Sequence, residues 1–469
     1  MERYRERPLG KPSCRNLFGG WHGRTYPASR WPGVRMTART AILALALLMV
    51  VHTPGASREY QKRVETVRRI PGLVAFWDFV LRDGDDFLAH TVKGDPHRYM
   101  LEPRNIACDY WHGGPEATMA DFPLLNRGPF GQAVRFQSPT PRNYLPVLLV
   151  PRAKLHGTPL DIKGPGQSVS MVAWLVYQHA NHAIAGIWHE GTDIPPASDP
   201  PAVVERGRRQ YALFGGLGAN SGGASAHVSE NGRASFGDRY ARNLAVTPET
   251  MKRVGADASV EEIDAGWSVV GFSFDNARDR VTAYLNGRAT EYWIDNPAGH
   301  PFYQHPARGW LQAKLAKMPG LQPGEDPAFP KDQYYEPPET KPRRERVIAR
   351  TAREKMVERT CQFTKVRLTL RRDPRGRWVP AEPPVLVALK VNPYWFGHDL
   401  YAPATESEGG PFTVGRVIHS NRHAIALSAY YGGVAVFNRV LTPGEMERLA
   451  QIGRPLSSRR GIPAVIPHP

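Results

Sequence analysis

Cysteine is scarce in this sequence, with three among 469 residues. Cys14 lies in an N-terminal segment that we expect to be removed, which leaves Cys108 and Cys361. Two cysteines, with no group of histidines at ligand spacing, exclude a structural zinc site. In an oxidising compartment the two can form one disulfide, and two buried free thiols are the alternative.

Long hydrophobic runs are also lacking. The apolar stretch at residues 41–51 has 11 residues, whereas a transmembrane helix needs about 20. It follows Arg39 and precedes the small residues 55–57, which is the pattern of a signal peptide that starts at Met36. We therefore expect export to the periplasm, the cell surface or the medium, with no transmembrane span in the mature chain. A single-pass anchor is the alternative.

Positive charge is plentiful but confined to two segments. The formal net charge of the chain is +17. Residues 1–56 hold nine basic and two acidic residues, and residues 341–377 hold fourteen basic and four acidic residues. These segments carry +7 and +10, so the rest of the chain is neutral. A local excess of this kind disfavours a general nucleic-acid-binding surface.

Glycine and proline are abundant, at 44 residues each, which favours short strands and turns over long helices. The stretch at 72–79 is continuously apolar, and "QSVSMVAWLVYQ" at 167–178 is apolar on both faces, as expected for a central strand. The stretches at 267–275 and 279–287 predict a hairpin, and Asn286-Gly287 predicts a further tight turn. This spacing predicts an all-β sandwich or barrel.

The strand pattern breaks after residue 297. Residues 343–359 show apolar positions at helical spacing, which predicts a helix, and residues 365–380 alternate around Asp-Pro-Arg-Gly, which predicts a hairpin. We interpret 298–382 as an insertion into the sandwich. Strands of the sandwich are expected to resume at 384–391 and to continue toward the C-terminus.

The stretch "GGVAVFNRVLTPGEMERLA" at residues 432–450 predicts a strand followed by a capped helix. Thr442 stands at the N-cap with Pro at the first helical position, and Glu445 stands at the third, which is a capping box. Leu441 and Met446 can pack together across the start of the helix. We expect this unit to close the sandwich.

Several quoted stretches, in this order, resemble a known family. "LVAFWDF", "FGQAVRF", "SVSMVAWLVY", "WSVVGFSFD", "VTAYLNG", "PFTVGR" and the closing unit are similar to the strands of laminin-G-like, concanavalin A-like jelly-roll domains of secreted bacterial proteins. The resemblance spans 72–452 apart from the insertion. It implies an all-β, two-sheet antiparallel jelly-roll sandwich with an inserted basic α+β segment.

Five segments follow from the pattern. They are an N-terminal extension with the signal peptide (1–57), the first part of the sandwich (58–297), the basic insertion (298–382), the closing strands and capped helix (383–455) and a tail (456–469).

The resembled family contains glycan-binding lectins, adhesion modules and some glycosidases. The glycosidases need two carboxylates arranged Glu-x-Asp-x-x-Glu. Here "EIDAGW" supplies Glu262 and Asp264, but Trp267 stands where the second Glu is required. We therefore predict a secreted, non-catalytic binding module for carbohydrate or another cell-surface polymer. A polysaccharide-degrading enzyme (glycosidase or lyase) and a protein-adhesion module are the alternatives.

Sugar recognition needs an apolar ring face beside polar groups. Three clusters offer this combination, and packing at the rim of the sandwich is the alternative for each. They are Tyr110-Trp111-His112, Trp188-His189-Glu190, and Tyr394-Trp395-Phe396 with His398.

The resemblance also implies one calcium ion at the rim of the sandwich. Asp83, Asp85 and Asp275 are the candidate ligands, and solvated turn carboxylates are the alternative. No other cofactor is expected.

The basic segment at 341–377 admits three interpretations. It can bind an acidic polymer such as a sulfated or uronic polysaccharide, it can bind nucleic acid, or it can be a solvated arm docked on its own domain. Nucleic acid is the least favoured partner, because the remaining surface is neutral and no known nucleic-acid-binding module is evident.

Overall fold

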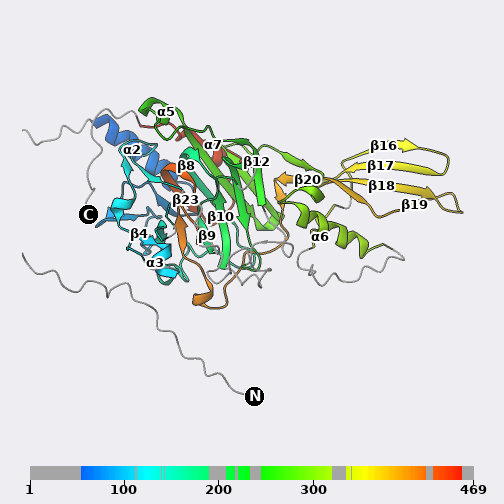
Figure 1. The fold of residues 1–469 in the computed structure, drawn as a ribbon, viewed down its shortest axis with the longest axis horizontal. Coiled ribbons are helices and arrows are strands. Elements are labelled where there is room, and N and C mark those ends of the chain that lie inside the picture. The colour runs from blue at the N-terminus through cyan, green and yellow to red at the C-terminus, as the bar shows by residue number, and fades with distance from the viewer. Residues whose placement is uncertain are drawn as a thin grey trace, which may run out of the picture.

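The computed structural model describes residues 54–110, 114–138, 140–141, 143–189, 208–216, 220–232, 244–318, 334–339, 341–418 and 426–456. The described chain forms a β-sandwich from which a third sheet projects to one side (Figure 1). We call this third sheet, with the helix at its base, the arm.

The first layer of the sandwich is an antiparallel sheet in the order β21-β14-β13-β8-β23-β6-β5, with β1 also paired to β23. Among the described residues its eight strands are β1 (Leu73–Trp77), β5 (Leu124–Leu125), β6 (Ala133–Phe136), β8 (Val169–His179), β13 (Trp267–Asp275), β14 (Arg280–Leu285), β21 (Tyr394–Trp395) and β23 (Ser428–Phe437).

The second layer is a sheet in the order β12-β11-β10-β9-β22-β7-β4-β3-β2. In the described part of the chain its nine strands are β2 (Arg82–Asp83), β3 (Asp86–Leu88), β4 (Met100–Asn105), β7 (Pro146–Val150), β9 (Ala183–His189), β10 (Arg208–Phe214), β11 (Gly223–Val228), β12 (Leu244–Thr250) and β22 (Phe412–Val414).

The main core lies between these two sheets. Trp77 of β1 stacks on Phe412 of β22 with ring centroids 5.2 Å apart, so the rings join the two layers directly. In the central strand β8 every residue from Val169 to Gln178 is buried. The prediction of an all-β, antiparallel two-sheet sandwich with β8 at its centre is confirmed.

The ends of the sandwich meet as the sequence predicts. β1 pairs with β23, with Phe76 opposite Ala435. Helix α7 (Pro443–Gln451) follows β23, and its capping box is formed: Glu445 N–H donates to Thr442 Oγ1 at 3.2 Å, and Thr442 N–H donates to Glu445 Oε2 at 2.8 Å.

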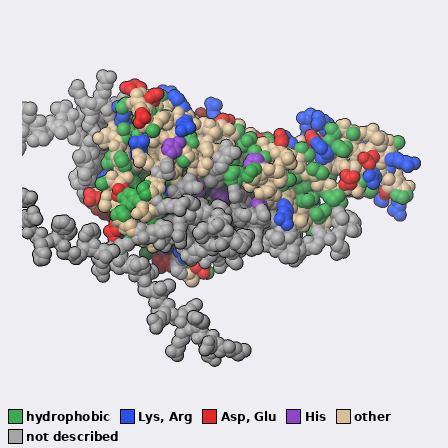
Figure 2. Space-filling model, in the orientation of Figure 1, with side chains coloured by type: hydrophobic (Ala, Val, Ile, Leu, Met, Phe, Trp, Pro, Cys, Tyr) green, Lys and Arg blue, Asp and Glu red, His purple; other side chains and the backbone are tan. Residues whose placement is uncertain are grey.

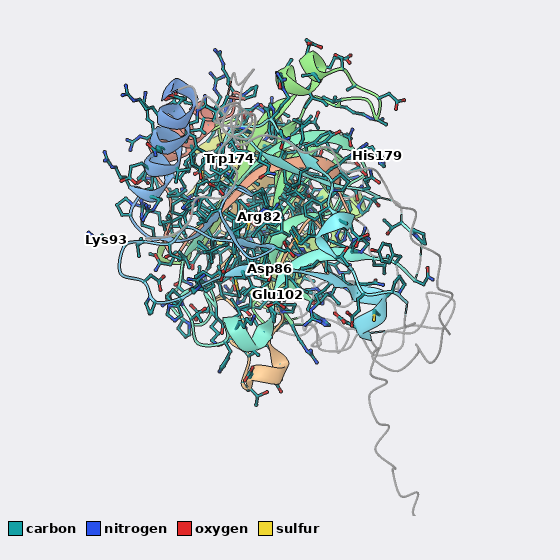
Figure 3. All side chains as sticks on the ribbon, turned by 90° about the vertical axis from the view of Figure 1, so that its left-hand side faces the viewer. Arg82, Asp86, Lys93, Glu102, Trp174 and His179 are labelled. Carbon is teal, nitrogen blue, oxygen red and sulfur yellow. The ribbon has the colours of Figure 1, made fainter. Side chains whose placement is uncertain are left out.

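Helix α2 (Pro54–Arg68) and α7 cover the outer face of the first sheet (Figure 1). Their apolar side chains pack around Trp174 of β8, which is labelled in Figure 3. A buried carboxylate fastens α2: Tyr60 Oη donates to Asp78 Oδ2 at 2.7 Å, and His90 Nε2 lies 2.8 Å from the same oxygen. No described helix is both long and apolar enough to cross a bilayer.

Short helical segments also occur in the described part of the chain. They are α3 (Ile106–Tyr110), α4 (Arg152–Leu155), α5 (Val260–Ala265) and the 3-10 turns η1 (Met119–Asp121), η4 (Asn276–Arg278), η5 (Pro297–Gly299) and η7 (Glu406–Glu408).

The arm is a sheet in the order β15-β20-β18-β17-β16, with β19 paired to the other edge of β18 over its distal half. Its described elements are β15 (Tyr292–Asp295), α6 (Gln304–Leu315), β16 (Arg344–Arg350), β17 (Glu354–Thr360), β18 (Thr364–Arg372), β19 (Trp378–Pro380) and β20 (Val385–Asn392). The strand expected at 384–391 in the sandwich is β20, which pairs with β15 and β18 instead.

The prediction of a helix at 343–359 is wrong, because these residues form the hairpin of β16 and β17. Thr351 closes the turn: its N–H donates to the Glu354 carbonyl at 2.7 Å, and its hydroxyl accepts from Glu354 N–H at 2.9 Å. Cross-strand pairs of opposite charge and of valine replace the helical i,i+4 contacts that the spacing suggested. The hairpin predicted at 365–380 is confirmed as β18 and β19.

Cys361 in the turn between β17 and β18 is a buried free thiol. The disulfide between Cys108 and Cys361 that the sequence allows is therefore not formed.

Candidate functional site

Trp188 and His189 end strand β9, and both are buried. The Trp188 ring lies 4.4 Å from the His227 ring, and the Arg209 guanidinium lies 5.7 Å from the indole centroid. Only 1% of Trp188 is exposed, and its role in sugar binding stays a prediction. Glu190 lies outside the described residues.

The Trp188 cluster lies on the outer face of the second sheet. Ile184 and Ile187 of β9 join the main core, whereas Trp188 packs in a separate cluster with Ala212 and Phe214 of β10. Sequence reasoning found the tryptophan but missed Arg209 and His227, because these residues come from other strands.

Tyr394 and Trp395 form β21 where the arm meets the sandwich. Tyr394 is fully buried and lies 5.4 Å from Tyr335, which stands 5.2 Å from Trp395 between ring centroids. Burial raises the pKa of Tyr394 well above its usual value. The rings of Phe396 and His398 also pack together, with their centroids 5.4 Å apart. These rings join the arm to the sandwich, and their role in sugar binding stays a prediction.

The third aromatic cluster falls at the limit of the described residues. Tyr110 is the last residue of α3, and its side chain is not described. Trp111 and His112 lie outside the described residues, so the structure does not test their role.

Asp83 and Asp85 lie on the hairpin of β2 and β3, at the end of the sandwich seen in Figure 3. Arg98 Nη2 donates to Asp83 Oδ2 at 2.5 Å, and Arg82 Nη1 donates to the Asp85 carbonyl at 2.7 Å. Partial burial, and then the charge of Glu102, raise the pKa of the neighbouring Asp86. The hairpin is thus held by arginines of the protein itself.

Asp275 ends β13 on the other sheet, where it caps η4 and accepts from Arg278 Nη1 at 3.1 Å. The described residues contain no group of three or more His, Cys, Asp or Glu side chains that could hold a metal ion. The fold therefore does not bring Asp83, Asp85 and Asp275 together, and calcium binding stays an untested expectation.

Glu262 and Asp264 belong to the short helix α5. Glu262 forms a capping box with Ser259, accepting from its N–H at 2.8 Å. Asp264 forms an ion pair with Arg127, with one hydrogen bond of 3.0 Å from Arg127 Nε. Both carboxylates therefore hold local structure.

The distal arm, which we define as residues 341–380, contains β16 to β19 and projects furthest from the sandwich (Figure 1). Its four acidic residues are all engaged by arginines of the arm. The pairs are Arg346–Glu358, Arg367–Glu358, Arg359–Glu345, Arg371–Glu354 and Arg377–Asp373.

The other basic residues of the distal arm form no ion pair with a carboxylate of the described residues. Figure 2 shows Lys and Arg side chains gathered along this projection. The nine residues are Lys341, Arg343, Arg344, Arg350, Arg353, Lys355, Lys365, Arg372 and Arg375. We call them the unpaired cations.

One face of the distal arm is charged. Arg346, Glu358 and Arg367 lie in one row across β16, β17 and β18, and Arg344 and Lys365 flank Thr360 in the next row. Rows on the same face of a sheet are about 7 Å apart. Two lines of positive charge therefore run along β16 and β18, with glutamates between them.

The opposite face carries both apolar and charged rows, and Arg350 lies opposite Lys355 in one of the charged rows. Val347, Val357 and Leu368 form one of its rows. Val357 is fully buried, whereas Val347 is 48% exposed. At its distal end the turn after β18 is ordered by Asp373. Hydrogen bonds from Arg377 N–H, and then the Arg377 guanidinium and Arg375 N–H, lower the pKa of this carboxyl.

No protein-family model matches this chain, and no curated protein matches it in sequence.

Solved structures show only distant likeness. The ligand-binding domain of botulinum neurotoxin serotype D, solved with N-acetylneuraminic acid, is 7% identical, with 81% of this chain and 50% of that chain covered and a TM-score of 0.31. Trypanosoma rangeli sialidase in complex with 2,3-difluorosialic acid is 9% identical, with 88% and 40% covered and a TM-score of 0.29.

A structure of botulinum neurotoxin type C, whose cell entry depends on interaction with two ganglioside molecules, is 7% identical, with 81% and 51% covered and a TM-score of 0.30. This chain thus spans about half the length of these chains or less.

Proposed function

We propose that this protein is an exported, non-catalytic binding module that holds an acidic carbohydrate polymer with its distal arm. The observation that carries the proposal is the set of nine unpaired cations on a projecting sheet. A linear polyanion can contact many of them at once, and each contact releases a counterion that the polymer had condensed.

The sandwich serves as the support for this arm. Its own aromatic candidates Trp188, Tyr394 and Trp395 are used in packing. Outside the two basic segments the chain is neutral. Attraction for an acidic polymer is therefore concentrated in residues 341–377, where the carboxylates are already paired.

Export is part of the proposal. The first described side chains of α2 that are buried, such as Tyr60 and Val64, follow the expected cleavage positions at 55–57. Cleavage there keeps these buried side chains of α2 in the chain. Mass spectrometry of the protein recovered from the exported fraction of an expressing cell is expected to show an N-terminus near residue 58. An intact N-terminus at residue 1 in that fraction would contradict cleavage.

The test uses two variants that lose the same charge from different regions. The arm variant changes Arg343, Arg344, Arg350 and Arg353 to Gln. The matched control changes four exposed cations of the sandwich to Gln, namely Arg58, Lys62, Lys93 and Lys252. Both are compared with the native protein on heparin, polygalacturonate, neutral dextran and duplex DNA.

We expect the native protein and the control to be retained on heparin and polygalacturonate and released by salt. The arm variant should elute at clearly lower salt, with a shallower dependence of affinity on salt concentration, because fewer counterions are released. Equal elution of both variants would refute the role of the arm. Tighter binding to DNA than to either polysaccharide would refute the proposal that the ligand is a carbohydrate.

The enzyme alternative is tested with the same panel. Release of reducing sugar, or of an unsaturated product that absorbs in the ultraviolet, would show a glycosidase or a lyase and would overturn the non-catalytic proposal. Retention that is lost on adding a chelator would show the calcium ion that the resemblance implies.

A further inference from the structure

Trp378 stands at the distal end of the arm, where it opens β19 opposite Arg372 of β18. Its side chain is half-buried. Three cationic groups surround the indole: Arg372 Cζ at 4.8 Å, Lys355 Nζ at 5.1 Å and Arg350 Cζ at 6.0 Å from the ring centroid.

The strand register places these groups on one face of the arm. Arg350 lies opposite Lys355, and Lys355 lies opposite Leu370. Arg372 is two residues beyond Leu370 and lies opposite Trp378. Residues directly opposite each other, and residues two apart on a strand, share a face. Four strands therefore deliver one ring and three charges to the same place.

Arg350, Lys355 and Arg372 all belong to the unpaired cations. The nearest acidic residues of the arm are engaged elsewhere: Glu354 holds Arg371 at 3.0 Å, and Asp373 holds Arg377 at 2.8 Å. The electron-rich face of the indole attracts each cation, but the three like charges repel one another. An anion placed among them would relieve this repulsion.

Trp293, at the base of the arm, provides a contrast. Lys365 and Lys390 lie 4.7 and 4.8 Å from its ring centroid. Here Glu291 accepts from Lys390 Nζ at 2.6 Å and from Trp293 Nε1 at 2.7 Å. Among the described residues, the protein thus supplies a carboxylate that pairs with a cation at Trp293 and no carboxylate that pairs with the cations at Trp378.

We propose that Trp378, Arg350, Lys355 and Arg372 form a binding site for one acidic sugar unit of the polymer, which we call the tip site. The indole stacks on the C–H face of the sugar ring, and the three cations hold its carboxylate or sulfate. This inference rests on the proposed function and deepens it. The tip site gives the arm a preference for sugar rings over polyanions in general.

The experiment compares a polyanion that has sugar rings with one that has none. Binding of oligogalacturonate and of inorganic polyphosphate of similar charge is measured by calorimetry at one salt concentration. The variants are Trp378→Ala, Trp378→Phe and, as the matched control, Trp293→Ala. Melting temperatures confirm that each variant is folded. If Trp378→Ala is not folded, Trp378→Phe takes its place in the comparison.

We expect Trp378→Ala to weaken oligogalacturonate binding about ten-fold, as for a tryptophan at the centre of an interface. Polyphosphate binding should change by less than about two-fold, because charge alone holds it. Trp378→Phe should keep part of the affinity for the sugar, and Trp293→Ala should keep all of it. A triple variant in which Arg350, Lys355 and Arg372 are changed to Gln should bind both probes more weakly.

An equal effect of Trp378→Ala on both probes, or no effect on either, would overturn the tip site while the proposed function stands. Failure of the native protein to bind either probe would overturn the proposed function and the tip site together.

Discussion

The sandwich and the distal arm are both antiparallel β-structure, yet their sequences have little in common. Strand β8 of the sandwich is buried along nearly its whole length, whereas all seven residues of β16 in the arm are exposed. The first is held by removal of apolar surface from water, which stabilises by about 25 cal/mol per Å². The second is held by pairing with its neighbour.

This difference separates stability from recognition. Exposed ion pairs such as Arg346–Glu358 contribute about 0–1 kcal/mol each, so the charged face of the distal arm adds little to the stability of the fold. Its charged side chains are instead free to meet a ligand. The sandwich, whose core side chains are buried between its two sheets, keeps the arm in place.

The largest effect on stability is expected in the sandwich, at Trp174. Its ring meets Phe130 edge-on at 5.0 Å, and its Nε1 donates to the Leu449 carbonyl at 3.2 Å. Trp174→Ala should reduce the free energy of unfolding by about 3–5 kcal/mol, because it leaves a cavity under α2 and α7. Urea titration followed by circular dichroism measures this. A loss below about 1 kcal/mol would mean that the layer under the helices is not close-packed.

A smaller loss is expected at Asp78, the buried carboxylate that fastens α2. It accepts from Val80 N–H and Leu81 N–H at 2.9 Å each, in addition to its contacts with Tyr60 and His90. Asp78→Ala should cost about 2–3 kcal/mol, since buried donors lose a charged partner. Tyr60→Phe is the control, with a loss of about 1 kcal/mol. Equal losses in the two variants would show that His90 and the backbone donors contribute nothing.

Asp78 should also make the stability of the fold depend on pH. Burial alone would raise its pKa, but the charge and hydrogen bond of His90, followed by the bonds from Leu81 and Tyr60, outweigh burial and lower the pKa. Because the pKa of Asp78 is lower in the folded state, its ionised form stabilises the fold at pH values above the pKa of the unfolded state, which is about 3.9. This stability is lost as the pH falls through the folded pKa, and Asp78→Asn should remove that dependence.

The N-terminal cap of the closing helix α7 is expected to contribute about 1 kcal/mol to the stability of the fold, as such caps usually do. Glu445 is the residue that tests this contribution. Hydrogen bonds from Arg439 first, and then from Thr442, lower its pKa from the ordinary 4.5 to about 2 against the opposing effect of burial. The cap should stabilise fully above pH 4.5 and weaken as the pH falls to about 2. Glu445→Gln should flatten the melting temperature across this window. An unchanged pH profile would contradict the assignment.

The smallest effects on stability are expected in the arm. Val347→Ala and Arg346→Gln, both at exposed positions of β16, should each change the free energy of unfolding by no more than about 0.5 kcal/mol. The same urea titration applies. Losses comparable to that of Trp174→Ala would erase the contrast between the two regions.

Much of the sandwich could be predicted from the sequence because its signals are local. The continuous apolar run of β8 predicts a strand buried on both faces, and Thr442 with Glu445 predicts the start of α7. The pairing of β1 with β23 follows from the order of the strands in the resembled family. Local composition and order are enough where burial dictates the pattern.

The arm could not be predicted as well, because its pattern is ambiguous. Valine, isoleucine and methionine at 347, 348 and 356 fit a helical stripe as well as two paired strands. The choice depends on cross-strand partners such as Glu345 with Arg359, which the sequence does not reveal until the turn at Thr351 is placed.

The candidate site was predicted only at the level of the segment. The excess of positive charge at 341–377 identified the arm, but burial of Trp188 and Tyr394 depends on tertiary packing. Trp378 was missed because its cations come from β16, β17 and β18 and meet only through the strand register. A tryptophan directly after an arginine-rich strand and turn was the available signal.

The claim that binding resides in the arm and stability in the sandwich is tested most directly by removing one hairpin. Arg343 N–H donates to the Thr360 carbonyl at 2.8 Å, so the two ends of the hairpin are adjacent and residues 344–359 can be replaced by a short glycine linker. Retention on heparin is then compared with that of the full chain. This claim predicts that the shortened chain elutes at clearly lower salt, because four of the nine unpaired cations are removed, while the melting temperature shifts by no more than about 3 °C, which corresponds to about 1 kcal/mol. Undiminished retention without the hairpin would contradict it.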